Sequence, residues 1–183
     1  MRLFVGIALP EDIRFRLSLL CCGLPNVRWV PPENMHLTLR FIGEVDNGVM
    51  QDIDAALAAV RAPRFMMSLA GVGHFGKEKN VRVIWAGVEK SPALQHLHDK
   101  IESAVVRSGQ PPDGQKFSPH VTLSRVKTPP PAGKLLEFIS SNNLFRAQPF
   151  EVTHFTLFSS FPSSEGSIYR AEESYELSRA QGN

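Results

Sequence analysis

Hydrophobic and polar positions alternate in several short runs of this chain and recur at helical spacing in others. Alternating runs rich in β-branched and aromatic residues predict strands, at 2–9, 27–30, 36–42, 65–75, 81–88, 117–126, 150–158 and 169–177. Apolar residues three and four positions apart predict helices, at 10–20, 49–60, 92–106 and 134–140. Because strands and helices are interspersed, with hairpin-like pairs of strands among them, the pattern predicts an α+β fold with mainly antiparallel sheet.

A four-residue pattern occurs once in each half of the chain. HLTL begins at His36, and HVTL begins 84 residues later at His120, each within a predicted strand. Two similar halves facing each other across a cleft would bring these two strands together. No low-complexity tract or long linker separates the halves, so we expect one bilobed domain over residues 1–183.

Composition and charge narrow the class of protein. The 183 residues are 43% hydrophobic and 21% charged, which is typical of a globular chain and excludes a disordered or coiled-coil protein. The net charge of +2, without a basic stripe, disfavours duplex binding but allows a small anion or a nucleic-acid end. Apolar runs are far shorter than the ~20 residues of a membrane span, and the N-terminus is typical of a strand, not a signal peptide. We therefore expect a soluble, cytoplasmic protein.

Histidine and threonine are paired more often than chance predicts. Six histidines and five threonines give roughly 0.16 His-x-Thr triplets in a random order, yet three occur, beginning at His36, His120 and His154. In a strand, the two residues of one triplet lie on the same face, roughly 6.5 to 7 Å apart. Each triplet can therefore present an imidazole and a hydroxyl to one cleft.

Two such strands would surround a small anion with two imidazoles and two hydroxyls. Phosphodiester cleavage needs one group to take a proton from the nucleophile and another to protonate the leaving oxygen, and histidine can do either at neutral pH. The sequence lacks a carboxylate-rich cluster at ligand spacing, so we expect no metal and no cofactor. Arg40 is in phase with His36 and Thr38 and is a candidate for contact with the anion.

Two segments resemble the motif regions of a known enzyme family. The segment from Arg28 to Glu44 resembles the first motif region of the RNA 2′,3′-cyclic phosphodiesterases, and the segment from Phe117 to Arg125 resembles the second. This family, historically called 2′-5′ RNA ligases, belongs to the two-histidine phosphoesterases. The opening strand and the closing strand near Tyr169 are also similar to the family, so the resemblance covers essentially the whole chain.

The resemblance implies a fold and an activity. The expected fold is bilobed, with two mainly antiparallel sheets, flanking helices, a pseudo-twofold axis and a central cleft. The expected reaction is metal-independent hydrolysis of terminal 2′,3′-cyclic phosphates to 2′-phosphomonoesters, with His120 as proton acceptor and His36 as proton donor to O3′. The expected partners are RNA 3′ ends with a cyclic phosphate, tRNA halves among them, or small cyclic nucleotides, acted on by a monomer.

The resemblance also assigns the residues that hold the phosphate. It implies that Thr38 and Thr122 bind the phosphate and that Arg125 lies near it. Strict alternation from His120 places Ser124 on the cleft face, so Arg125 requires a bulge or a long reach. Arg40 is the second candidate cation.

Two alternative functions and one extra triplet stay open at this point. The main activity could be 2′-5′ ligation of RNA, because the same residues serve both directions of the reaction. The chain could instead be a non-catalytic module that binds a nucleotide or an RNA end. The family segment that matches His154 is a core strand without a catalytic histidine, so we interpret this third triplet as structural.

Overall fold

The computed structural model describes residues 1–179, so the last four residues of the predicted domain, 180–183, lie outside the described part. The helices are α1 (Glu11–Ser18), α2 (Asn47–Ala58), α3 (Pro92–Arg107) and α4 (Ala132–Asn142), with 3₁₀ turns η1 (Pro32–Asn34) and η2 (Glu78–Asn80). The strands are β1 (Arg2–Ala8), β2 (His36–Glu44), β3 (Phe65–Met67), β4 (Leu69–Phe75), β5 (Val83–Val88), β6 (His120–Arg125), β7 (Phe150–Val152), β8 (His154–Ser163) and β9 (Gly166–Glu176). No helix within residues 1–179 has both the length and the apolar character needed to cross a membrane.

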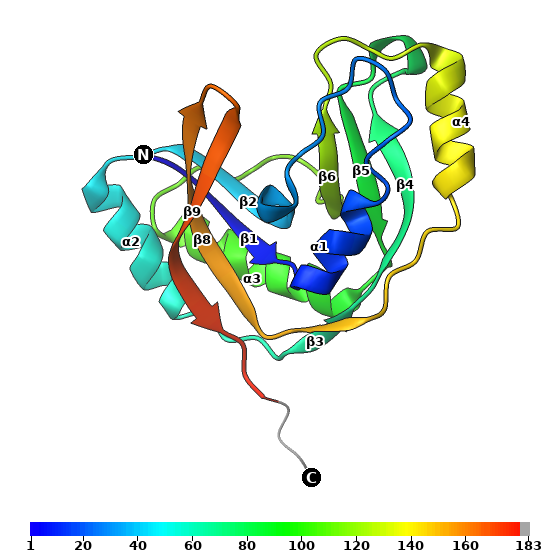
Figure 1. Ribbon diagram of the computed structural model, residues 1–183. Helices are drawn as coiled ribbons and strands as arrows, with labels where there is room; N and C mark the ends of the chain where they lie inside the picture. The colour runs from blue at the N-terminus through cyan, green and yellow to red at the C-terminus, as the bar shows by residue number, and fades with distance from the viewer. Residues whose placement is uncertain (180–183) are drawn as a thin grey trace.

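Seven strands form one sheet in the order β4-β5-β6-β2-β1-β8-β9, and β3 and β7 form a small second sheet. Two groups of strands meet at the centre of the large sheet, where β2 and β6 align at a single antiparallel pair, Leu37 opposite Val121. The strands of the two groups, β4-β5-β6 and β2-β1-β8-β9, diverge from this junction (Figure 1). The expected α+β fold with antiparallel sheets is therefore confirmed.

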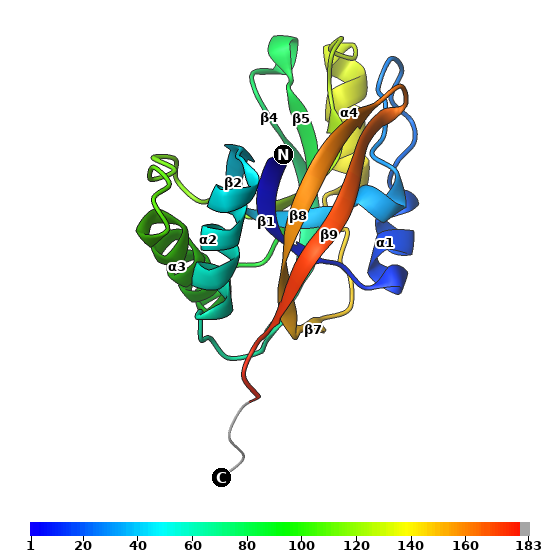
Figure 2. The same cartoon turned by 90° about the vertical axis from the view of Figure 1, so that its left-hand side faces the viewer.

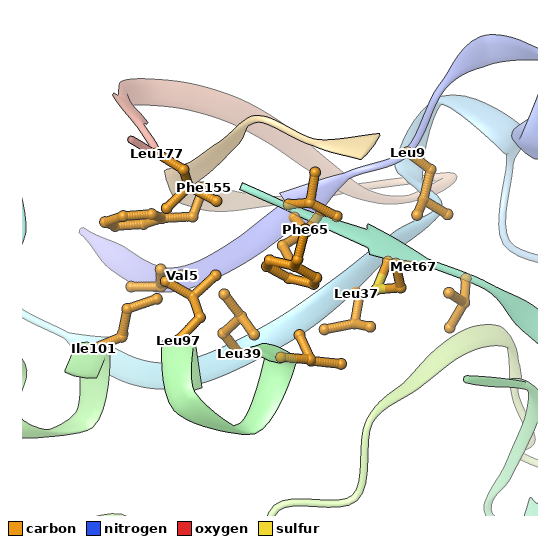
Figure 3. Packing of buried hydrophobic residues seen from close by; sticks show 14 of the residues in the cluster. Val5, Leu9, Leu37, Leu39, Phe65, Met67, Leu97, Ile101, Phe155 and Leu177 are labelled. Carbon is orange, nitrogen blue, oxygen red and sulfur yellow. The ribbon is translucent and has the colours of Figure 1, made fainter. Parts of the chain in front are cut away.

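The helices cover the sheet from one side in each half. Helices α2 and α3 pack beside β2 and β9, whereas α4 packs on β4 at the other end (Figures 1 and 2). Alternate residues of the central strands point into the larger core: Val5, Leu37, Leu39, Val121 and Leu123. Figure 3 shows Leu97 and Ile101 of α3 close to this layer. Since one face of β2 and β6 is buried in this way, the intervening residues are left on the opposite face.

Three predicted strands differ from the structure. The predicted strand 65–75 is divided, because β3 pairs with β7 while β4 pairs with β5. The predicted strand 150–158 is divided between β7 and β8 for the same reason. Residues 27–30 form no strand, and Trp29 makes one isolated bridge with Ser124. Alternation reports which face a side chain occupies but not the partner strand, so it does not show where a chain changes sheets.

Candidate active site

The two predicted motifs meet at the junction of the two lobes. Their four polar side chains lie on one face of β2 and β6: His36, Thr38, His120 and Thr122. The antiparallel pair Leu37 and Val121, both fully buried, places each histidine opposite the threonine of the other strand. Facing residues in antiparallel strands have Cβ atoms ~4.5–5.5 Å apart. The structure therefore brings both triplets together, related by a pseudo-twofold axis through the Leu37–Val121 pair.

Backbone carbonyl groups fix the orientation of both imidazoles. The Nδ1 atom of His36 donates to the carbonyl oxygen of Asn34 at 2.7 Å, and the Nδ1 atom of His120 donates to that of Ser118 at 2.7 Å. A carbonyl oxygen only accepts, so Nε2 carries the lone pair in each neutral ring. The Thr38 hydroxyl lies 2.9 Å from Nε2 of His36. Within residues 1–179, Nε2 of His120 has no hydrogen-bond partner, which leaves it available to a water molecule.

Both central strands contain a β-bulge at the same point of the motif. In β2, the residues on either side of Leu39 pair with consecutive residues of β1, so Leu39 is the extra residue. In β6, the residues on either side of Leu123 pair with consecutive residues of β5. A bulge shifts the alternation by one position. Phe41 and Arg125, which are also 84 residues apart, therefore follow the threonines on the open face.

The structure contains the bulge that Arg125 requires to reach the site. Arg125 lines the same cavity as His36, of about 420 Å³. Ser124, which strict alternation would place there, is fully buried and donates to the carbonyl oxygen of Arg28 at 2.6 Å. The guanidinium of Arg125 is thus positioned beside the two imidazoles.

The expectation that Arg40 faces the cleft is wrong. The bulge at Leu39 turns this side chain toward the core, where it is 6% exposed. Its guanidinium donates to the carboxylate of Glu102 and to the carbonyl oxygens of Phe41 and Pro111. Arg40 therefore fastens β2 to α3 and to the loop that follows α3, and its donors are occupied within the protein.

Arg40→Ala should lower the free energy of unfolding by about 3 kcal/mol, because it leaves a partly buried carboxylate and a carbonyl oxygen without their donor. Urea denaturation followed by circular dichroism measures this loss. The catalytic activity of the folded variant should stay close to that of the parent chain. A variant of unchanged stability whose activity had collapsed would instead place Arg40 in the site.

Burial and positive charge lower the pKa of both histidines. For His36 and for His120, burial is the largest cause that holds the pKa below its ordinary value of 6.5. The Asn34 and Ser118 carbonyl oxygens oppose this shift by accepting from the protonated rings. The charge of Arg125 lowers both pKa values further, and His120 does the same to His36. The electrostatic coupling is independent evidence that these groups lie close together.

Aromatic side chains surround both imidazoles. Tyr169 meets His36 edge-on with ring centroids 5.2 Å apart, and Phe4 lies 4.8 Å from the same ring. On the other side, Phe75 meets His120 edge-on at 4.8 Å. The motif analysis missed Phe4 and Tyr169 because they lie on β1 and β9, far from either motif. Only the register of the sheet shows that they share the site.

Two cavities meet at the pair of motifs. His36 and Arg125 line one, of about 420 Å³, and Thr38 and His120 line another, of about 340 Å³. Phe41 lines both, so together they form one cleft, and its side chain is 52% exposed there. An exposed aromatic ring in a cleft can stack on a planar ligand.

The third triplet lies outside this cleft. His154 begins β8, which is separated from β2 by β1. Its exposed imidazole shares a hydrogen bond of 2.7 Å with the Thr153 hydroxyl, and its Nε2 lies 3.8 Å from Oε1 of Glu176. His154 lines a different cavity from His36 and His120.

Potential metal ligands do not gather in the described part of the chain. Within residues 1–179, no three histidine, cysteine, aspartate or glutamate side chains form a group that could hold a metal ion. The polar groups of the cleft are imidazole, hydroxyl and guanidinium, which are suited to an anion.

Comparisons with known proteins place this geometry in a family. A family model described as the 2′-5′ RNA ligase superfamily matches residues 22–161, which include both motifs. An RNA 2′,3′-cyclic phosphodiesterase of Aeropyrum pernix is 35% identical over 158 residues, covering 86% of this chain and 89% of that protein. The structure of TT0787 of Thermus thermophilus has a TM-score of 0.81 at 27% identity, covering 97% of this chain and 98% of that one. Escherichia coli LigT complexed with 3′-AMP has a TM-score of 0.76 at 30% identity, covering 96% and 97%.

Proposed function

Since this chain belongs to the 2′-5′ RNA ligase superfamily, as an RNA 2′,3′-cyclic phosphodiesterase, we propose that it hydrolyses terminal cyclic phosphates to 2′-phosphomonoesters by proton transfer through His36 and His120. The observation that carries this proposal is the pair of facing His-x-Thr motifs on one face of β2 and β6. The crystallised complex of a relative, Escherichia coli LigT, with 3′-AMP supports a nucleotide ligand for this cleft.

The two imidazoles occupy opposite ends of the proposed reaction. Nε2 of neutral His120 takes a proton from water, whose oxygen attacks phosphorus in line with the P–O3′ bond. That bond breaks, and Nε2–H of protonated His36 gives its proton to O3′. The phosphate stays on O2′, and the free 3′-hydroxyl is restored. The hydrogen bonds from Nδ1 to the carbonyl oxygens support these roles, because they keep both Nε2 atoms directed to the cleft.

The remaining polar groups would stabilise charge on the phosphate. Thr38 and Thr122 follow the two histidines on the same face, so each can donate a hydroxyl proton to a non-bridging oxygen. The guanidinium of Arg125 offers paired donors for the negative charge that collects on those oxygens. All the proton transfers and charge contacts of this proposal use side chains of the chain itself.

Identification of the product tests this function. A defined oligonucleotide ending in a 2′,3′-cyclic phosphate is incubated with the protein in EDTA, and the product is assigned by ³¹P NMR. We expect a 2′-phosphomonoester, formed as fast as without EDTA. A 3′-phosphomonoester would reverse the assignment of the leaving oxygen, and loss of turnover in EDTA would refute the metal-independent mechanism. Oligonucleotides with the ends of tRNA halves, together with cyclic mononucleotides, would show which predicted substrates are preferred.

The pH dependence of kcat/KM should be bell-shaped, with its maximum below pH 6.5. Activity needs His120 neutral and His36 protonated, and kcat/KM reports the pKa values of the free enzyme. Because both pKa values are lowered, kcat/KM should fall already as the pH rises through neutrality, when His36 loses its proton. Rates with a cyclic mononucleotide between pH 4.5 and 8.5 measure the profile. A plateau above pH 7 would show that no protonated imidazole is needed.

A further inference from the structure

A third cavity opens beside His120, on the side of the cleft away from His36. Its volume is about 590 Å³, and it is lined mainly by apolar side chains of β5, the loop before β6 and the start of α3. Phe75, Trp85 and Phe117 contribute three aromatic rings. This volume lies within the ~300–1,000 Å³ of small-molecule sites. Hydrolysis of a cyclic phosphate does not explain such a cavity, because water needs no apolar site.

The stereochemistry of the proposed reaction decides what this cavity faces. In-line attack places the nucleophile opposite O3′, and the substrate ribose carries both O3′ and O2′. With His36 at O3′, the substrate ribose lies toward the 420 Å³ cavity, whose polar lining includes Arg2 and Arg125. His120 lies at the nucleophile and forms one wall of the aromatic cavity. A molecule held there would present its own hydroxyl where the attacking water stands.

We propose that the aromatic cavity beside His120 binds a nucleoside with a free 5′-hydroxyl, which attacks the cyclic phosphate in place of water. This inference rests on the proposed function, because it uses the same two histidines. His120 takes the proton of the 5′-hydroxyl, the 5′-oxygen forms a bond to phosphorus, the P–O3′ bond breaks and His36 protonates O3′. The product is a 2′-5′ phosphodiester with a free 3′-hydroxyl. Atoms and charge balance without a co-reactant.

The walls of the cavity suit a nucleobase. The ring of Trp85 packs flat over β4, where a Cβ at Gly73 would lie 2.4 Å from it, so the ring is held in place by the missing side chain. Phe117 is fixed by stacking on His98, with centroids 4.0 Å apart and planes 7° apart. Rigid aromatic rings bind bases of any sequence by stacking. The basic residue at the rim, Lys90, is positioned for a phosphate on the acceptor strand.

The partition between transfer and hydrolysis tests the proposal. The protein is incubated with a 2′,3′-cyclic mononucleotide and increasing adenosine, and the 2′-5′ dinucleotide is separated from the 2′-phosphomonoester. We expect dinucleotide formation to saturate with adenosine and 5′-deoxyadenosine to inhibit it competitively. Isothermal calorimetry with adenosine alone should show binding. Dinucleotide that increases linearly with adenosine, without measurable binding, would overturn the proposal even where hydrolysis is normal.

Two substitutions fill the cavity from opposite walls. Gln95→Trp acts from the exposed start of α3 and Val88→Phe from the end of β5, so a folding defect in one does not prevent the test. Each should lower the transfer-to-hydrolysis ratio about tenfold, as expected for loss of base stacking, and weaken adenosine binding. Lys100→Trp, exposed on the same helix outside the cavity lining, is the matched control and should change neither.

Hydrolysis by the filled variants separates this inference from the proposed function. We expect their kcat/KM for the cyclic mononucleotide to stay near that of the parent chain. A large rise in KM for hydrolysis would show that the cavity holds the base of the cyclic nucleotide itself, and the inference would be wrong. A parent chain that binds adenosine but hydrolyses no cyclic phosphate would refute the proposed function while leaving the nucleoside site in place.

Discussion

His36→Ala and His120→Ala should each lower kcat/KM for a 2′,3′-cyclic phosphate by about 10³-fold, within the 10²–10⁴-fold range of general acid–base catalysis. Each substitution removes one of the two proton transfers, and no other titratable side chain in the cleft replaces it. The double variant should lose little more than either single variant, because the two groups act in one step. Steady-state hydrolysis of a cyclic mononucleotide measures all three.

The third triplet provides a matched control. His154→Ala makes the same change in the same three-residue context but outside the cleft, where the imidazole is exposed beside Glu176. Its kcat/KM should match that of the parent chain. An inactive but folded His154→Ala variant, or a fully active His36→Ala variant, would show that a different pair of triplets performs the reaction.

Arg125→Ala should lower kcat/KM by about 10²-fold, because it removes a donor aimed at the oxygens where transition-state charge collects. Arg125→Lys should recover only part of this loss, since an ammonium group keeps the charge but not the paired donors of a guanidinium. Rates with the same cyclic mononucleotide measure both variants. Arg107→Ala, which removes an exposed arginine at the end of α3, is the control and should be fully active.

The pH profile distinguishes a contact with phosphate from a purely structural role for Arg125. Its positive charge lowers the pKa of both His36 and His120. Removing that charge should therefore raise both pKa values and move the maximum of kcat/KM to higher pH. A lower rate with an unmoved profile would mean that the guanidinium does not act on the imidazoles.

The pairing of the two motifs could be predicted because it depends on the simplest property of a strand. Side chains two residues apart share a face, so His36 with Thr38, and His120 with Thr122, follow from alternation alone. The internal duplication then predicted that the two strands meet, and the Leu37–Val121 pair confirms this. Neither step required knowledge of the loops.

The misplacement of Arg40 shows where such reasoning fails. A bulge adds one residue to a strand, and nothing distinguishes Leu39 or Leu123 from an ordinary strand leucine. The duplication did contain a usable signal: if Arg125 requires a bulge, its counterpart 84 residues earlier is Phe41, and Arg40 corresponds to buried Ser124. Applying the same bulge to both copies would have placed all of these residues correctly.

Residues contributed by neighbouring strands could not be predicted from the motifs. Tyr169 and Phe4 contact His36 because β9, β8 and β1 follow β2 in the sheet. That order depends on which strands pair over long sequence separations, which alternation does not encode. The cavity beside His120 likewise depends on how the start of α3 meets β5.

The most direct measurement is a crystal structure with a nucleoside 2′,3′-cyclic vanadate, a mimic of the five-coordinate transition state. We expect the vanadium between the two strands, with Nε2 of His36 and Nε2 of His120 each within ~3.2 Å of an opposite apical oxygen. Thr38, Thr122 and Arg125 should contact the equatorial oxygens. Vanadate bound away from this junction, or within reach of only one imidazole, would contradict a mechanism that uses both.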